Sequence, residues 1–224
     1  MGGFANNAPI VTDGLVFYVD AGNSSSYPGS GTTWTDLIGS NNATLDNVPT
    51  YSSSNGGGIV FDGSNDHVDF AENSMSYPNT SSDFTLSMFL KTTNGSSNKV
   101  IFQQENGGGS GRSWLGLAAN NDRFYSYLGG SRLELTSITV SDNTIYNVIV
   151  KYDSGVLHIG YNGAWAQSST RSIDENATGD FILGAGKSIN NPMDGNIYTV
   201  SIYDRALSSA EVLQNYNALK NRFV

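Results

Sequence analysis

The chain is poor in residues that support cross-links or cationic surfaces. It contains no cysteine, so no disulfide can stabilise its fold and no thiolate can act as a nucleophile. Only 11 residues are lysine or arginine, against 20 aspartates and glutamates, and the formal net charge is −9. Such acidity disfavours nucleic acids and anionic membrane surfaces as partners, but it leaves cations as potential ligands.

Long apolar segments and targeting signals are also absent from the sequence. No stretch approaches the roughly 20 apolar residues that a membrane-spanning helix needs. The first nine residues have neither the basic nor the apolar region of a secretory signal. We therefore expect no membrane insertion. A protein of this kind that works outside a cell would leave it by lysis, by assembly into a particle or by a signal-independent exporter.

What the sequence does contain is the pattern of many short strands. Its 26 glycines, with abundant Ser, Thr and Asn, separate short apolar runs, which is typical of strands joined by turns. Within residues 84–91, every second side chain is apolar and is expected in the core: Phe84, Leu86, Met88 and Leu90. The length suits one two-sheet domain at residues 13–224, preceded by a flexible polar arm of residues 1–12.

The last thirty residues predict one strand followed by one helix. Alternation in residues 197–203 places Tyr198, Val200 and Ile202 on one face of a half-buried strand. Ser208 and Glu211 then have the S-x-x-E spacing of a capping box. The predicted apolar stripe of the following helix consists of Val212, Leu213, Tyr216 and Leu219.

Five segments together resemble a known family in their order and spacing. They are the F-D-G-x-x-D-x-V hairpin at 61–70, the strand at 83–91, the paired strands at 146–152 and 156–161, and the strand at 181–184. With these segments, the chain resembles the concanavalin-A-like lectin/glucanase superfamily, specifically its laminin-G-like jelly rolls. The resemblance implies an all-β fold, a two-sheet antiparallel jelly-roll sandwich with one short C-terminal helix. Many relatives carry Asp-Gly in the central hairpin, whereas this chain has Asn162-Gly163, which keeps the turn but lacks the carboxylate.

Three further segments resemble one particular version of this domain. Residues 20–23, 26–37 and 215–223 are similar to the form that recurs in structural proteins of tailed bacteriophages, especially marine ones. This resemblance implies a place on the virion surface, with phage capsid or tail and fibre proteins as partners and the arm of residues 1–12 as the attachment segment.

The resemblance to glucanases does not extend to their catalytic residues. Glucanases of the superfamily use two glutamates close together on one strand, and retaining hydrolysis needs carboxyl groups roughly 5 Å apart. The five glutamates of this chain are far apart in sequence: Glu72, Glu105, Glu134, Glu175 and Glu211. His158 is expected in a structural or solvent-facing position and His67 at the surface, and no G-x-S-x-G motif is present. We therefore predict that the protein is not an enzyme.

The hairpin at residues 62–66 is the predicted metal site. Many laminin-G-like relatives hold calcium at the rim of the sandwich, and Asp62, Asn65 and Asp66 occupy positions of the family's F-D-G-x-x-D motif. Calcium takes six to eight oxygen ligands, so two carboxylates with nearby carbonyls would suffice. The alternative is that these side chains only satisfy backbone groups of their own turn.

Four aromatic residues are the predicted glycan contacts. An aromatic ring can stack on the apolar side of a sugar, while amides and carboxylates bind its hydroxyl groups. The candidates are Trp114, Tyr125, Tyr127 and Trp165, with core packing as the alternative for each.

These patterns favour a non-enzymatic, lectin-like domain displayed on a phage virion as a capsid decoration or a fibre-associated protein. Adhesion to cell-surface glycans would be an added role. The alternatives are a free calcium-dependent carbohydrate-binding module and, less favoured, a glycoside hydrolase.

Overall fold

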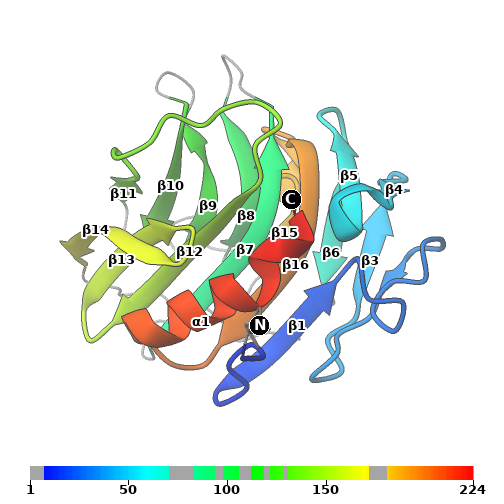
Figure 1. Cartoon of the computed structure of the whole chain (residues 1–224). Coiled ribbons are helices and arrows are strands. Elements are labelled where there is room, and N and C mark those ends of the chain that lie inside the picture. The colour runs from blue at the N-terminus through cyan, green and yellow to red at the C-terminus, as the bar shows by residue number, and fades with distance from the viewer. Residues whose placement is uncertain are drawn as a thin grey trace.

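Figure 1 shows the computed structural model of the chain, in which two antiparallel sheets pack into a sandwich and one helix crosses its front. The structure describes residues 8–70, 83–93, 98–105, 112–118, 122–128, 131–171 and 181–223. Within these ranges, no helix has both the length and the apolar character needed to span a bilayer. The predicted all-β, two-sheet architecture with one short C-terminal helix is confirmed.

Sheet A contains eight strands and brings distant parts of the chain side by side. Its order is β14-β13-β12-β7-β16-β5-β4, and β1 also pairs with β16. The strands are β1 Leu15–Asp20, β4 Thr50–Ser52, β5 Gly58–Asp62, β7 Phe84–Thr92, β12 Tyr146–Asp153, β13 Val156–Tyr161, β14 Ala164–Thr170 and β16 Asp194–Tyr203. The long strand β16 therefore lies against both the first strand and β7.

Sheet B also contains eight strands, in the order β11-β10-β9-β8-β15-β6-β3-β2. They are β2 Thr33–Trp34, β3 Ala43–Asp46, β6 His67–Phe70, β8 Lys99–Glu105, β9 Arg112–Ala118, β10 Arg123–Leu128, β11 Ser131–Glu134 and β15 Phe181–Leu183. The helical elements of the described residues are α1 Ser209–Leu219 and the short 3₁₀ turns η1 Ser54–Gly56, η2 Lys187–Ile189 and η3 Lys220–Phe223.

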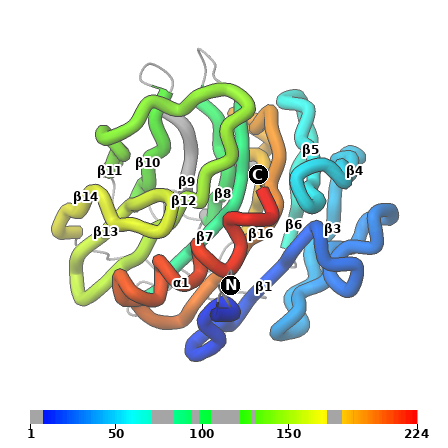
Figure 2. The backbone as a smooth tube through the Cα atoms, viewed as in Figure 1, coloured from blue at the N-terminus to red at the C-terminus, as the bar shows by residue number. Residues whose placement is uncertain are grey.

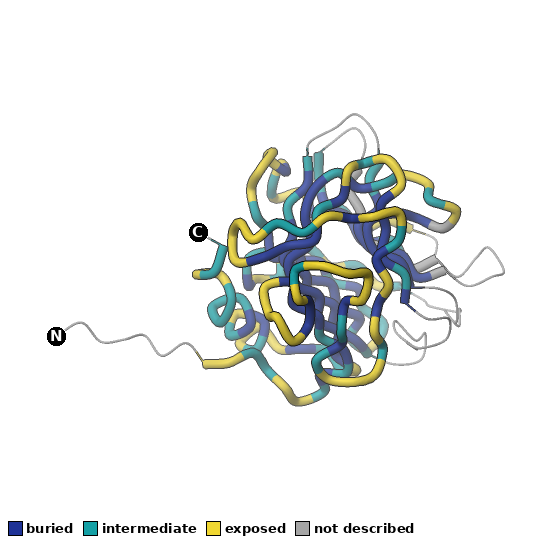
Figure 3. Tube along the Cα trace, turned by 90° about the vertical axis from the view of Figure 1, so that its right-hand side faces the viewer, coloured by how far each residue is buried: buried dark blue, intermediate teal, exposed yellow. Residues whose placement is uncertain are grey.

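The main core lies between the two sheets. The four alternating side chains predicted for residues 84–91 all belong to it and are at most 4% exposed, which confirms that prediction. Phe70 and Phe181 of sheet B meet edge to face, with ring centroids 4.4 Å apart, and Phe17 of sheet A packs against both. Figure 3 shows this arrangement as buried strands surrounded by exposed turns.

The connection between β1 and β5 is held to the sandwich by two buried residues. Figure 2 shows it in blue to cyan, and it contributes β2 and β3 to sheet B and β4 to sheet A. The Trp34 ring is fully buried in the main core. The buried Asp36 carboxylate accepts hydrogen bonds from the backbone N–H groups of Tyr18, Ile38, Gly39 and Asn41, at 3.0 to 3.3 Å. A polar loop of this length is thereby fixed to β1.

Helix α1 and the segment after it pack on the outer face of sheet A (Figure 1). The predicted capping box is confirmed, because the Ser208 and Glu211 side chains each bind the other's backbone N–H. Phe89 of β7 stacks on Phe223 and Tyr216, with centroids 4.6 and 6.1 Å away. The expected apolar stripe is wrong at Leu213, which is 48% exposed, whereas the polar Asn215 is buried in its place.

The predicted alternation of the last strand is also wrong at Tyr198. The register of β16 shifts between Ile197 and Thr199, so a bulge interrupts the period of two. Ile197, Val200 and Ile202 belong to the main core, whereas the Tyr198 ring packs against Phe223, 5.1 Å away. The bulge therefore supplies an additional aromatic surface for the C-terminal segment.

Residues 9–11, which belong to the predicted arm, bind the domain itself. The Val11 N–H donates to the Asn215 side chain at 2.8 Å, and the Val11 carbonyl accepts from the Tyr203 hydroxyl at 3.0 Å. Gln214 donates to the Pro9 carbonyl at 2.7 Å. Burial raises the pKa of Tyr203 to about 12, so this hydroxyl stays protonated and remains a donor. Residues 1–7 of the arm lie outside the described residues.

Candidate functional site

One row of residues crosses the outer face of sheet B from β3 to the edge strand β11. Neighbouring strands pair so that seven residues stand directly opposite one another: Thr44, Asp69, Ile182, Gln103, Trp114, Tyr127 and Arg132. Residues paired in this way lie on the same side of a sheet. The core residues of these strands, such as Leu45, Val68 and Leu183, occupy the alternating positions. The row therefore belongs to the face that points away from the core.

At the β10–β11 end of this row, aromatic and charged side chains lie together. Tyr127 is half-buried, and Arg132, opposite it, is exposed. The Arg132 guanidinium lies 5.1 Å from the centroid of the Tyr125 ring and 3.9 Å from the Glu134 carboxylate. Tyr125 itself is fully buried, and this burial raises the pKa of its hydroxyl. Of the two predicted tyrosines, Tyr127 is therefore the one that a ligand can reach from solvent.

The two predicted tryptophans lie in different sheets. Trp114 holds its register position in β9, between Gln103 of β8 and Tyr127 of β10. Its side chain lies outside the described part of the structure. Trp165 is half-buried on β14 of sheet A, where the Lys151 ammonium lies 5.1 Å from its ring and His158 packs beside it. Sheet B thus brings together Trp114, Tyr125 and Tyr127, and Trp165 is not part of that group.

The predicted calcium hairpin connects β5 to β6. Asp62 and Asn65 are exposed, and Asp66 is 5% exposed. Asp66 accepts from the Asp62 N–H at 3.1 Å, and Asp62 accepts from the Ser64 N–H at 2.8 Å, so both carboxylates bind the turn. Burial raises the pKa of Asp66, although the hydrogen bond from Asp62 opposes this effect. Calcium binding at these three residues stays a prediction.

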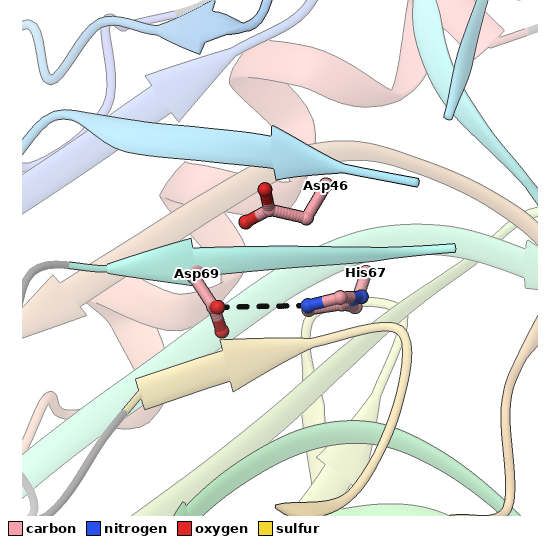
Figure 4. A group of neighbouring side chains, drawn as sticks. All are labelled: Asp46, His67 and Asp69. Atoms are coloured by element: carbon pink, nitrogen blue, oxygen red, sulfur yellow. Dashed lines mark ion pairs between the residues drawn. The ribbon is translucent and has the colours of Figure 1, made fainter. Parts of the chain in front are cut away.

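A second group of potential metal ligands lies next to this hairpin, on the outer face of sheet B. Figure 4 shows Asp46 of β3 and His67 and Asp69 of β6 pointing toward one another. One ligand atom from each residue lies within 4.8 Å of the others, and His67 Nε2 is 3.5 Å from Asp69 Oδ2. His67 is 7% exposed, so the expectation of a surface histidine there is wrong. The group shares no residue with the predicted set.

The sequence alone could place only two of these three residues together. His67 and Asp69 are two residues apart in one strand, so the period of two already places them on one face. Asp46 is remote in sequence and becomes their neighbour only because β3 pairs with β6, with Asp46 opposite His67. The pairing partner of a strand cannot be read from its own alternation.

Two packed antiparallel sheets, one covered by a helix and the other with a polar and aromatic outer face, define a β-sandwich of the lectin type. The model of the concanavalin A-like lectin/glucanases superfamily, in its laminin-G form, matches residues 62–213. The chain belongs to this family. No curated protein sequence matches the chain.

Solved structures share this fold at low sequence identity. The sialidase of Trypanosoma rangeli, in complex with the inhibitor DANA, has a TM-score of 0.72 at 15% identity over 98% of this chain and 35% of the sialidase. Domain 4 of AbnA, an extracellular GH43 arabinanase from Geobacillus stearothermophilus in complex with arabinotriose, has a TM-score of 0.68 at 18% identity. That match covers 90% of this chain and 98% of the domain.

The binding domain of botulinum neurotoxin serotype D matches with a TM-score of 0.69 at 14% identity, over 91% of this chain and 51% of that structure. The chain spans about a third of the length of the sialidases. Likeness at this level of identity establishes the fold, which lectins and glucanases share, and leaves function to the residues of the site.

Proposed function

We propose that the protein is a non-enzymatic, lectin-like domain that is displayed on a phage virion, as a capsid decoration or a fibre-associated protein, and adheres to glycans. The observation that carries the glycan part is the row across sheet B, because it combines amide, carboxylate, guanidinium and aromatic groups on one face. Helix α1 and η3 pack on the opposite face of the sandwich, on sheet A, so the exposed Arg132 and the half-buried Tyr127 and Asp69 of this row lie away from the helix.

The chemistry of the row suits a sugar chain. Tyr127 supplies a half-buried ring beside exposed Arg132, and the half-buried Asp69 supplies a carboxylate farther along the same row, whereas Gln103 between them is 6% exposed. Adjacent strands are about 4.8 Å apart, so a row over several strands is long enough for more than one sugar unit. The geometry favours an extended oligosaccharide that lies across the strands.

The virion part of the proposal is supported by the sequence resemblance to structural proteins of tailed phages. It agrees with an acidic, cysteine-free chain, which needs no oxidising compartment to fold. The proposed partners are therefore capsid or tail and fibre proteins on one side and cell-surface glycans on the other.

The proposal of a non-enzymatic role is supported by how the glutamates are used. The Glu211 carboxylate accepts hydrogen bonds from Arg205 and from the backbone N–H of Ser208, so it stabilises the start of α1. Glu105 and Glu134 lie in β8 and β11, which β9 and β10 separate in sheet B. Among the glutamates that the structure describes, no two lie on neighbouring strands as the carboxyl pair of a retaining glycosidase would; Glu72 and Glu175 lie outside the described residues.

A free carbohydrate-binding module is the second candidate function. The arabinanase domain favours it, because this chain covers 98% of that domain, whose structure was solved with arabinotriose. Calcium at Asp62, Asn65 and Asp66 would belong to this alternative. It requires glycan affinity in the isolated protein, and virion attachment is not needed.

A glycan array with purified protein, in calcium and in chelator, tests the proposal. We expect saturable binding that Tyr127→Ala weakens about 2- to 10-fold, the range of one aromatic stacking contact. Tyr161→Ala is the matched control, because Tyr161 is also a half-buried strand tyrosine but belongs to sheet A. A blank array, or equal losses in both variants, would contradict the glycan-binding face and favour a purely structural decoration.

A further inference from the structure

We propose that Asp46, His67 and Asp69 form a binding site for a divalent transition-metal ion such as Zn²⁺, on the outer face of sheet B (Figure 4). The site is carried by two paired strands rather than by a loop. Asp46 lies opposite His67 across the β3–β6 ladder, and Asp69 follows His67 on the same face. Ladder hydrogen bonds thus fix the spacing of all three side chains before any ion binds.

The hydrogen bonds of His67 present its Nε2 atom to the two carboxylates. Nδ1 is 3.0 Å from the carbonyl oxygen of Asn65. A carbonyl oxygen only accepts, so Nδ1 carries a proton and donates it. Asn47 donates to the same carbonyl at 3.2 Å, and its amide nitrogen, 3.4 Å from Nδ1, is a second donor there rather than a partner for the ring.

A neutral His67 with its proton on Nδ1 has a lone pair on Nε2, which faces the Asp69 carboxylate. Both atoms then offer lone pairs in the same direction, and a metal ion is a group that both can bind; the ring itself is 7% exposed. Metal-binding histidines show the same arrangement, because the other ring nitrogen commonly donates to a backbone carbonyl and thereby orients the ligand atom.

The separation of the two atoms suits a metal ion better than a direct hydrogen bond. Nε2 and Asp69 Oδ2 are 3.5 Å apart. A hydrogen bond between a charged nitrogen and an oxygen is about 2.7 to 2.9 Å long. Two ligands of tetrahedral zinc, each about 2.0 to 2.1 Å from the ion, lie about 3.4 Å from each other. The observed spacing therefore leaves room for an ion with only small side-chain movements.

The ligand types select the class of metal. An imidazole nitrogen with two carboxylates suits zinc and its neighbours, whereas calcium prefers six to eight oxygen ligands. Three protein ligands also leave one position of a tetrahedral ion open for water or for a group of a ligand. The competing state without a metal is a protonated His67 paired with Asp69, and the experiment below separates the two.

Titration calorimetry of the untagged, chelator-treated full chain with ZnCl₂ tests the proposal, together with the visible spectrum after addition of CoCl₂. We expect one Zn²⁺ per chain, retained in excess Ca²⁺, and the absorption bands of tetrahedral Co²⁺. His67→Gln should weaken binding at least about 10-fold, the loss typical of a removed ligand or its support. Asp46→Asn should do the same, and it perturbs folding less because Asp46 is only half-buried.

His158→Gln is the matched control, because His158 is the other histidine of the chain and lies on β13 of sheet A, beside Trp165. Its zinc binding should equal that of the wild type. Absence of zinc uptake, uptake that His67→Gln and Asp46→Asn leave unchanged, or full displacement by Ca²⁺ would each overturn the proposal. Absence of zinc uptake would leave the protonated ion pair as the state of this group.

Discussion

Asp36 is a buried polar anchor of the connection between β1 and β5. Its carboxylate is 5% exposed and accepts four backbone N–H groups, one from β1 and three from the loop. Asp36→Ala leaves these donors without their acceptor; each hydrogen bond contributes about 0.5 to 1.5 kcal/mol, and water can replace the carboxylate most easily at the exposed Ile38 and Gly39. We expect the free energy of unfolding in urea to fall by about 2 to 4 kcal/mol.

Asp13→Ala is the control for this measurement. Asp13 is an aspartate whose side chain is 87% exposed, and its ion pair with Arg205, at 3.0 Å, lies at the surface. Exposed pairs contribute about 0 to 1 kcal/mol, so this substitution should change the stability little. Equal effects of the two substitutions would contradict the structural role of Asp36.

At the scale of elements, α1 depends on one carboxylate for both its cap and its ion pair. Glu211 accepts two hydrogen bonds from the Arg205 guanidinium and one from the Ser208 N–H. The bonds from Arg205, followed by the one from Ser208, lower the pKa of Glu211 from 4.5 to about 2. A lowered pKa in the folded state stabilises the protein above the unfolded pKa, and this contribution is lost as the pH falls from about 5 to 2.

Glu211→Gln should therefore destabilise the protein by about 1 kcal/mol at pH 7, since water screens the partly exposed pair. The difference from the wild type should shrink as the pH falls toward 2, where about half of the Glu211 side chains are protonated in the folded state. Urea unfolding at several pH values measures this. Glu134→Gln is the control, because its contact with Arg132 is longer, at 3.9 Å. A pH-independent effect of Glu211→Gln would contradict the ionic contribution.

The sequence predicted elements well where one local rule decided the structure. The capping box of Ser208 and Glu211 and the alternation of Phe84 to Leu90 depend on residues a few positions apart, and both are confirmed. The predictions were wrong where packing between elements decided which side chains are buried, against the strand or helix periodicity of the sequence. The bulge of β16 turns Tyr198 toward Phe223, and α1 buries Asn215 against Tyr203 instead of Leu213 against the sheet.

At the scale of the whole molecule, the candidate site depends on topology more than on any motif. The row across sheet B joins residues from β3, β6, β15, β8, β9, β10 and β11, an order that the chain does not follow. Tyr127 could be proposed from its residue type, but its position in line with Gln103 and Asp69 follows only from strand pairing. The metal cluster likewise needed the pairing of Asp46 with His67.

The two parts of the N-terminal arm should have separable roles. Residues 9–11 bind α1 and β16 through hydrogen bonds of 2.7 to 3.0 Å, and Ile10 and Val11 pack against the second apolar cluster, which contains Leu207 and Val212. Deleting residues 1–11 should therefore lower the free energy of unfolding by about 1 to 3 kcal/mol, from lost hydrogen bonds and apolar burial. Deleting residues 1–7 should leave it unchanged, as urea unfolding of both variants would measure.

The same pair of deletions tests the proposed attachment to the virion. If residues 1–7 attach the domain, their deletion should abolish cosedimentation with particles that lack the protein, while glycan binding and stability remain those of the wild type. Loss of cosedimentation only in the deletion of residues 1–11, which also removes contacts of the fold, would instead place attachment in the folded domain. Unchanged occupancy in both deletions would reject the arm as the attachment segment, because another surface of the sandwich must then make the contact.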